Sequence, residues 1–322
     1  MNVLVTRRLL PGVLDPLRRW AVDVWKGEGP MPRSELTKRV ADVDGLLCML
    51  TDRIDAELLA AAPRLRVVSQ MAVGVDNVDL GACTARGIPV GHTPGVLTET
   101  TADTAWALLA AATRRIPEGH DHVRGGHWGP WDPGLLLGGD LWDTTLGIVG
   151  LGRIGAAVAR RACGFSMRVL YTGPHRKPHL EARLRVAYRG LDDLLAESDH
   201  VVLTAPLTPE TRHLIGRDAL RRMRPDATLV NVARGGLVDH EALYEALTEG
   251  WIGRAALDVT EPEPIPGDHP LVGLPNCLII PHLGSASERT RRAMAELAVA
   301  NLVRGLRGEP LVHCANPEVE RP

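Results

Sequence analysis

This sequence has no large excess of positive or negative charge, no long apolar run and no targeting segment, and each of these absences excludes a class of protein. The 37 basic and 39 acidic residues nearly cancel, so the chain lacks the basic field that nucleic acids or anionic membranes require. The longest apolar stretch, about residues 105–112, is too short to span a bilayer. The N-terminus is typical of a strand, so we expect no signal peptide and a cytoplasmic protein.

Cysteine and histidine are equally uninformative about metals. The five cysteines are scattered, odd in number and not spaced as metal ligands, which is typical of free thiols in a reducing compartment. His120, His122 and His127 cluster without matching a metal signature. We therefore predict no metal site.

Two series of short apolar strands alternate with helical patterns, and this predicts two parallel sheets covered by helices. The first series has strands at residues 3–5, 45–50, 67–72 and 88–90. The second has six, at residues 146–149, 168–171, 200–203, 228–231, 255–257 and 277–280. A helical pattern at about 287–304 follows the second series and is expected to return to the first. We predict two doubly wound α/β domains, one of residues 95–286 and a discontinuous one of residues 1–94 and 287–322.

The segment between the two series begins with a long helix, expected at residues 98–115. A loop rich in Gly, Pro and Trp follows it at residues 125–139. We expect this loop to be ordered, because Trp128, Trp131 and Trp142 should be buried somewhere.

A glycine motif opens the second series and predicts a dinucleotide-binding, Rossmann-type domain. Gly150, Gly152 and Gly155 stand as Gly-x-Gly-x-x-Gly, with a strand before them and a helical pattern after them. Such glycines permit a tight turn, a close approach of the backbone to pyrophosphate, and close helix–strand packing. Arg153 and Ile154 lie inside the motif and are predicted cofactor contacts.

The cofactor type is predicted from the turn after the next strand. An acidic residue there would bind the ribose of NAD, but the turn reads Thr172-Gly-Pro-His175-Arg176-Lys177. Cations in this place can pair with a 2′-phosphate, so NADP is favoured over NAD, with Thr172, His175, Arg176 and Lys177 as contacts.

Three unusual residues follow the late strands, where open α/β sheets bind their ligands. Arg234 can clamp a carboxylate and polarise the neighbouring carbonyl. His282 can donate the proton that a carbonyl oxygen needs as hydride reaches its carbon. Glu263 can favour the imidazolium form and orient the ring. These types predict hydride transfer to a 2-keto acid.

Across nearly its whole length the chain resembles the D-isomer-specific 2-hydroxyacid dehydrogenases. The segments at residues 71–79, 93–102, 206–211 and 231–235 are similar to signatures of that family. Its Arg/Glu/His set falls on Arg234, Glu263 and His282. The resemblance implies a flavodoxin-like substrate domain, an active site in the cleft between the domains, and a substrate carboxylate held by the Val73 and Gly74 amides together with Arg234.

Further contacts follow from the same resemblance. It implies cofactor contacts at Pro206, Val232, Asp258 and Gly284, and a substrate contact at Ser285. It also implies a homodimer built around the predicted helix 98–115 and the Trp-rich loop. Leu50, at the end of the second N-terminal strand, and the partner's tryptophans are candidate walls of the side-chain pocket.

Within the family the chain is most similar to the glyoxylate/hydroxypyruvate reductase branch, notably at residues 282–286 and 301–310. This predicts NADPH-dependent reduction of glyoxylate and hydroxypyruvate to D-2-hydroxy acids. One alternative is NAD-dependent oxidation of 3-phosphoglycerate, formate or phosphite on the same fold, which favours an acid near Thr172 or Gly173. The other is a non-enzymatic, NAD(H)-sensing corepressor, which would need an extra partner-binding segment.

Overall fold

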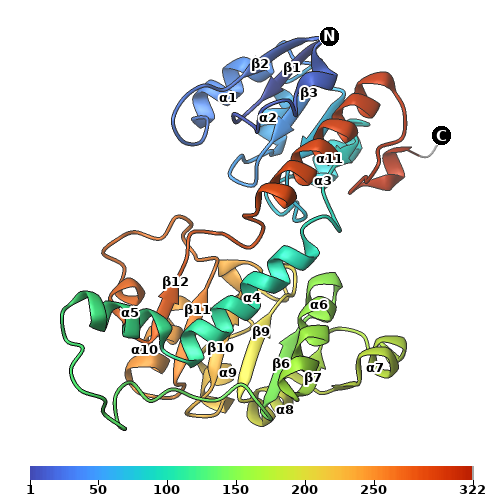
Figure 1. Ribbon diagram of the computed structural model, residues 1–322. Helices are drawn as coiled ribbons and strands as arrows, with labels where there is room; N and C mark the ends of the chain where they lie inside the picture. The colour runs from blue at the N-terminus through green and yellow to red at the C-terminus, as the bar shows by residue number, and fades with distance from the viewer. Residues whose placement is uncertain (321–322) are drawn as a thin grey trace. The chain divides into compact units, whose positions relative to one another are not determined.

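The computed structural model describes residues 1–320, and the chain forms two compact units (Figure 1). The first unit comprises Met1–Leu97 and the segment from Ser287 onward, and the second is Thr98–Ala286. The first boundary was predicted three residues earlier, at the Pro94-Gly95 break; it lies instead where the first helix of the second unit begins.

The first unit is a five-stranded parallel sheet with helices on both faces. Its elements are β1 (Asn2–Val5), β2 (Ala21–Val24), α1 (Arg33–Val40), β3 (Gly45–Cys48), α2 (Ala56–Ala60), β4 (Val67–Gln70), α3 (Leu80–Ala85), β5 (Val90–Gly91) and α11 (Glu288–Arg307). The strand order is β2-β1-β3-β4-β5, the flavodoxin-like order.

The alternation of side chains along β1 explains how this sheet is covered. Val3 and Val5 point to the face that α11 covers, where they pack with Ala298 and Leu302. Leu4 points to the opposite face and joins the core formed with α1, α2 and α3. The helix after the second series therefore packs on the first sheet, as predicted.

The second unit is a seven-stranded parallel sheet. Its elements are α4 (Thr98–Thr113), α5 (Ile116–Arg124), β6 (Thr145–Val149), α6 (Arg153–Ala162), β7 (Arg168–Thr172), α7 (Pro178–Leu184), β8 (Val186–Tyr188), α8 (Leu191–Glu197), β9 (His200–Leu203), α9 (Arg217–Arg222), β10 (Thr228–Asn231), α10 (His240–Thr248), β11 (Arg254–Leu257) and β12 (Cys277–Ile279).

The strands lie in the order β12-β11-β10-β9-β6-β7-β8. From β6 the chain first adds strands on one side, β7 and β8, and then continues on the other side of β6 with β9. Counted from β6, six of them follow the Rossmann order 3-2-1-4-5-6, which β12 extends. Both units are thus doubly wound parallel sheets, and the predicted fold class is confirmed.

Two short edge strands, β2 and β8, were not predicted. An edge strand is covered less fully than a central one, so its sequence lacks a continuous apolar run. The sequence Ala-Val-Asp-Val of β2 is only partly buried, with a charged side chain among apolar ones.

The predicted helix 98–115 ends earlier than expected, and the tryptophans of the loop region that follows it are not buried. Arg115 adopts a left-handed conformation (φ 53°) that separates α4 from α5. Trp128, Trp131 and Trp142 are 74%, 86% and 69% exposed in the single chain. The expectation that they are buried is therefore wrong for one chain, because no part of residues 1–320 covers them.

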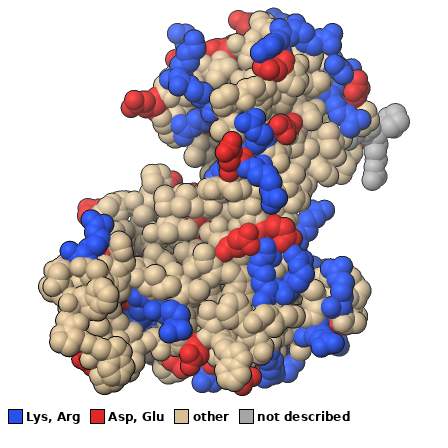
Figure 2. Space-filling model, in the orientation of Figure 1, with Lys and Arg blue, Asp and Glu red and all other residues tan. Residues whose placement is uncertain are grey.

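The surface carries charges of both signs. Figure 2 shows basic and acidic side chains interspersed on the visible face of each unit, in keeping with a net charge of −2. Among residues 1–320 no helix is long and apolar enough to cross a membrane.

Candidate active site

Three neighbouring strands carry the predicted catalytic side chains to one edge of the second sheet. β10 pairs with β11 and β11 with β12, all parallel, so their carboxyl ends meet at the same edge. Arg234 follows β10, Glu263 follows β11 and His282 follows β12. Residues 48 positions apart in sequence are therefore brought to one place by strand order.

His282 and Glu263 form a direct pair. Nδ1 of His282 lies 2.6 Å from Oε1 of Glu263, and both side chains are partly exposed, by 26% and 34%. A carboxylate at Nδ1 fixes the ring so that Nε2 faces away from it. The pair has the arrangement of a proton donor and the group that orients it.

The turn that presents His282 is held by Asp258. His282 has a positive φ of 54°, a conformation that a non-glycine residue keeps only when its surroundings enforce it. Its N–H donates to the Asp258 carbonyl (2.9 Å), and the Asp258 carboxylate accepts from the N–H groups of Leu283 (2.5 Å) and Gly284 (2.9 Å). Burial raises the pKa of Asp258. Asp258, predicted as a cofactor contact, holds this turn in the structure.

The loop that carries Glu263 is braced by contacts the sequence analysis did not foresee. Gly235 packs against the backbone at Thr260, where a Cβ would lie 2.0 Å from the carbonyl carbon. Arg212 donates to both oxygens of Glu261 (3.0 and 2.9 Å). Burial opposes ionisation of Glu261, but bonds from Arg212 and His213 outweigh it and lower its pKa. No sequence signal joins residues 49 positions apart.

Arg234 stands on a turn built by Asn231. The fully buried Asn231 donates from Nδ2 to the Arg234 carbonyl (2.8 Å) and accepts the Ala233 N–H at Oδ1 (3.0 Å). Nη1 of Arg234 donates to the Ala233 carbonyl (2.8 Å). The partly buried guanidinium is thus directed by its own turn at the strand end.

The glycine loop has the geometry that a pyrophosphate requires. Gly150 has a φ of 97°, and a Cβ there would lie 2.7 Å from the Ala205 nitrogen. A Cβ at Gly155 would lie 2.3 Å from the Gly150 carbonyl oxygen. Gly152 instead faces open space, and within the described chain no side chain caps the start of α6. Free helix N–H groups beside open space fit an anionic cofactor.

Arg153 is exposed at the start of α6, while Ile154 packs on the core beneath it. The other predicted cofactor contacts lie on loops at the same sheet edge: Pro206 after β9, Val232 after β10, and Gly284 after β12. The Thr204 hydroxyl donates to the Gly150 carbonyl (2.6 Å) and so ties the β9 loop to the glycine loop.

The basic turn after β7 is more structured than its sequence suggests. The carbonyl of Thr172 accepts the Gly150 N–H (3.0 Å), and Nζ of Lys177 donates to the Leu151 carbonyl (2.8 Å). His175 is exposed. Arg176 forms a two-pronged ion pair with Glu181 of α7. The predicted cations are present, but both already have partners.

In the first unit, the loop after β4 presents two amides in one direction. The Ala72 carbonyl accepts the Thr93 N–H (2.8 Å), and Nδ1 of His92 lies 3.0 Å from the Val73 carbonyl. In a trans peptide the N–H points opposite to the C=O. The N–H groups of Val73 and Gly74 therefore both point away from the segment at residues 92–93, as a carboxylate-binding pair would.

Two predicted substrate contacts have simpler surroundings. Leu50 is half-buried and follows β3; it was placed after the second strand because β2 was not predicted. Ser285 is buried in the second unit, beside the turn of His282.

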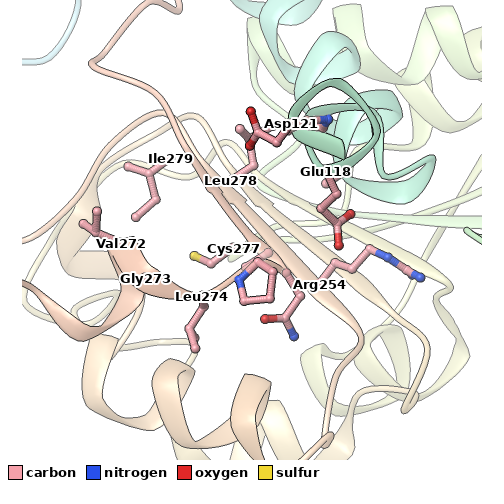
Figure 3. Close-up of a pocket in the computed structure, with 14 residues that line it drawn as sticks. Glu118, Asp121, Arg254, Val272, Gly273, Leu274, Cys277, Leu278 and Ile279 are labelled. Atoms are coloured by element: carbon pink, nitrogen blue, oxygen red, sulfur yellow. The ribbon is translucent and has the colours of Figure 1, made fainter. Parts of the chain in front are cut away.

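A pocket of about 570 Å³ lies elsewhere in the second unit (Figure 3). Glu118 and Asp121 of α5 line one side, and Arg254 and Cys277, which begin β11 and β12, line another. None of the three predicted catalytic residues lines it. The pocket begins at the amino ends of these strands, whereas open α/β sheets bind their ligands at the carboxyl ends. We therefore do not assign the reaction to this pocket.

A family model and curated relatives match most of this chain. The family model described as "D-isomer specific 2-hydroxyacid dehydrogenase, NAD binding domain" matches residues 106–284. A glyoxylate reductase of Korarchaeum cryptofilum is 52% identical over 320 residues, covering 99% of this chain and 96% of its own.

Two solved structures are also similar. A protein of Thermus thermophilus is 50% identical, with a TM-score of 0.92, covering 98% of this chain and 100% of its own. The NADPH-dependent glyoxylate/hydroxypyruvate reductase of Sinorhizobium meliloti, solved with NADP and malonate, is 32% identical, with a TM-score of 0.86 and coverages of 100% and 98%.

Proposed function

Because this chain belongs to the D-isomer-specific 2-hydroxyacid dehydrogenase family, we propose that it reduces glyoxylate and hydroxypyruvate to D-2-hydroxy acids with NADPH. Membership makes it an NAD(P)-dependent dehydrogenase; the substrate and the cofactor preference are the proposal. The observation that carries it is the 2.6 Å His282–Glu263 pair at the sheet edge that also holds Arg234 and the glycine loop.

Each residue has a defined task in this proposal. Arg234 binds the substrate carboxylate, with the N–H groups of Val73 and Gly74 as further donors. His282 donates a proton to the carbonyl oxygen, and Glu263 stabilises and orients the imidazolium. The glycine loop would hold the pyrophosphate of the cofactor, whose nicotinamide would supply the hydride to the carbonyl carbon. Fixing the carboxylate and the carbonyl oxygen together selects the face of the substrate that reacts.

The names of the relatives support small substrates. The matched Korarchaeum protein is a glyoxylate reductase, and the Sinorhizobium protein reduces glyoxylate or hydroxypyruvate. Leu50 is proposed as a wall of the side-chain pocket, and Ser285 as a further substrate contact. An apolar wall that leaves no room for an added methylene costs about 1–3 kcal/mol in kcat/KM.

NADPH is proposed as the preferred cofactor because no carboxylate follows β7 directly and two cations do. Arg176 is exposed and can reach a 2′-phosphate, whereas Lys177 is tied to the glycine loop. The Sinorhizobium relative is described as NADPH-dependent and was solved with NADP.

Initial rates with NADPH and NADH test this function directly, measured against glyoxylate, hydroxypyruvate, pyruvate and longer 2-keto acids. We expect kcat/KM to be highest for glyoxylate or hydroxypyruvate, with D-glycerate as the product of the latter. NADPH should be favoured by about tenfold, equivalent to about 1.4 kcal/mol. Faster turnover of branched or aromatic keto acids would overturn the substrate assignment, and equal rates with both cofactors would overturn the cofactor assignment.

We also propose that the chain forms a homodimer through α5 and the loop that follows it. The large apolar residues of α4, Trp106, Leu108 and Leu109, are buried in their own unit, so this helix supplies little of the exposed apolar surface that was expected of it. Exposed apolar side chains lie instead on α5 and beyond, at Ile116, Val123, Trp128, Trp131 and Leu137, and soluble monomers seldom expose so large an apolar set.

Light scattering at micromolar concentration should therefore give about twice the chain mass of 34.8 kDa. Replacing Trp128 and Trp131 by Ser should shift the mass toward that of one chain. A wild-type protein that scatters as a single chain would rule the dimer out.

A further inference from the structure

A carboxylate from the next helix lies at the turn after β7, although the turn itself contains no acidic residue. Glu181 is the only acidic residue between positions 172 and 181, and it lies on α7, the helix that follows the turn (Figure 1). Its Oε1 accepts Nε of Arg176 (2.9 Å), and its Oε2 accepts Nη2 of the same guanidinium (2.8 Å). The acid missing at the strand end is thus supplied from the next helix.

Tyr171 fixes this carboxylate in place. The Tyr171 side chain is completely buried in β7, and its hydroxyl donates to Oε1 of Glu181 (2.8 Å). The same hydroxyl accepts the N–H of Lys177 (2.6 Å) and so ties the turn to the helix. The Glu181 side chain is 14% exposed, whereas that of Arg176 is 66% exposed. The carboxylate is the anchored partner, and the guanidinium is the one that a ligand can reach.

The charge of the turn follows from these contacts. Hydrogen bonds from Arg176 and then Tyr171 lower the pKa of Glu181, so it is ionised at neutral pH. With histidines neutral, the two cations less one carboxylate leave a net charge of +1 over residues 172–181. A 2′-phosphate must either draw Arg176 away from Glu181 or lie close to that carboxylate. NADH carries no 2′-phosphate, so its binding neither breaks the Arg176–Glu181 ion pair nor brings a second negative charge close to Glu181.

We propose that Glu181 is a specificity-determining residue that restrains the preference for NADPH by holding Arg176 in an ion pair. This inference rests on the proposed NADP contact at Arg176. Both cofactors then remain usable, because the carboxylate offsets part of the attraction that Arg176 offers to the phosphate. Tyr171 acts as the positioning residue for the carboxylate.

Glu181→Gln removes the charge but keeps an oxygen that can accept the Tyr171 hydroxyl. We expect the ratio of the NADH Kd to the NADPH Kd to rise about threefold or more, the scale of an exposed ion pair. The NADPH Kd should fall while the NADH Kd stays unchanged. Titration of nicotinamide fluorescence in the absence of substrate measures both constants. The gain should shrink in high salt, because exposed charges are screened.

Glu197→Gln is the matched control. Glu197 also pairs with arginines of the same unit, Arg168 (2.6 Å) and Arg189 (2.9 Å), but lies at the end of α8. Its loss changes the net charge equally and should leave the ratio as it is. If the ratio of the NADH Kd to the NADPH Kd rose equally in both variants, the effect would come from net charge alone and the inference would be wrong.

Arg176→Ala separates this inference from the cofactor proposal. If that variant weakens NADPH binding while Glu181→Gln leaves the ratio unchanged or lowers it, Glu181 does not restrain NADPH and the inference is wrong, although the cofactor proposal stands. If Arg176→Ala leaves NADPH binding intact, the 2′-phosphate is bound elsewhere, and both the proposed contact at Arg176 and this inference are wrong.

Discussion

His282→Ala is expected to lower kcat for glyoxylate or hydroxypyruvate by about a hundredfold or more, the usual contribution of a positioned general acid. Its ring is held at Nδ1 by Glu263, and its backbone by Asp258, so the imidazole is oriented before any substrate arrives. Alanine keeps the carboxylate-binding donors but leaves the carbonyl oxygen to take its proton from water. Steady-state rates with saturating cofactor measure the loss.

Cofactor binding should survive this change, because the glycine loop and the basic turn are separate from His282 in the sheet. His179→Ala is a suitable control, since His179 is exposed on α7 and should retain full turnover. A folded His282→Ala protein that binds NADPH and turns over at a normal rate would exclude His282 as the proton donor.

Glu263→Gln is expected to lower kcat by about tenfold or more, because the ring of His282 loses the carboxylate that orients it. Oε1 of Glu263 lies 2.6 Å from Nδ1 of His282. Glutamine can turn either its oxygen or its NH2 group toward the ring, so it does not hold Nε2 in one fixed direction.

Steady-state rates with saturating cofactor measure this loss. Glu245→Gln provides the control, because Glu245 forms an ion pair with Arg217 on the surface of the same unit and should leave kcat unchanged. A folded Glu263→Gln protein with the kcat of the wild type would mean that Glu263 does not orient His282 for the reaction.

The interior strands could be predicted because burial on both faces leaves an almost continuous apolar run. β9 (His200–Leu203) and β10 (Thr228–Asn231) have the predicted ends. Edge strands leave a weaker signal, and β2 and β8 were missed for that reason. Tryptophans gave the wrong expectation, because Trp128 and Trp131 are as apolar as core residues although the single chain leaves them exposed.

The sequence by itself determined the two doubly wound sheets, the glycine loop, and the chemical types of Arg234, Glu263 and His282. These are local properties: apolar periodicity, the backbone freedom of glycine, and residues placed directly after strands. Only the tertiary structure decided the contacts between distant segments. It joined Glu263 to His282, turned the Val73 and Gly74 amides to one side, and brought Glu181 to Arg176. Such contacts depend on strand order and on where each helix returns to its sheet, and spacing along the chain does not encode them.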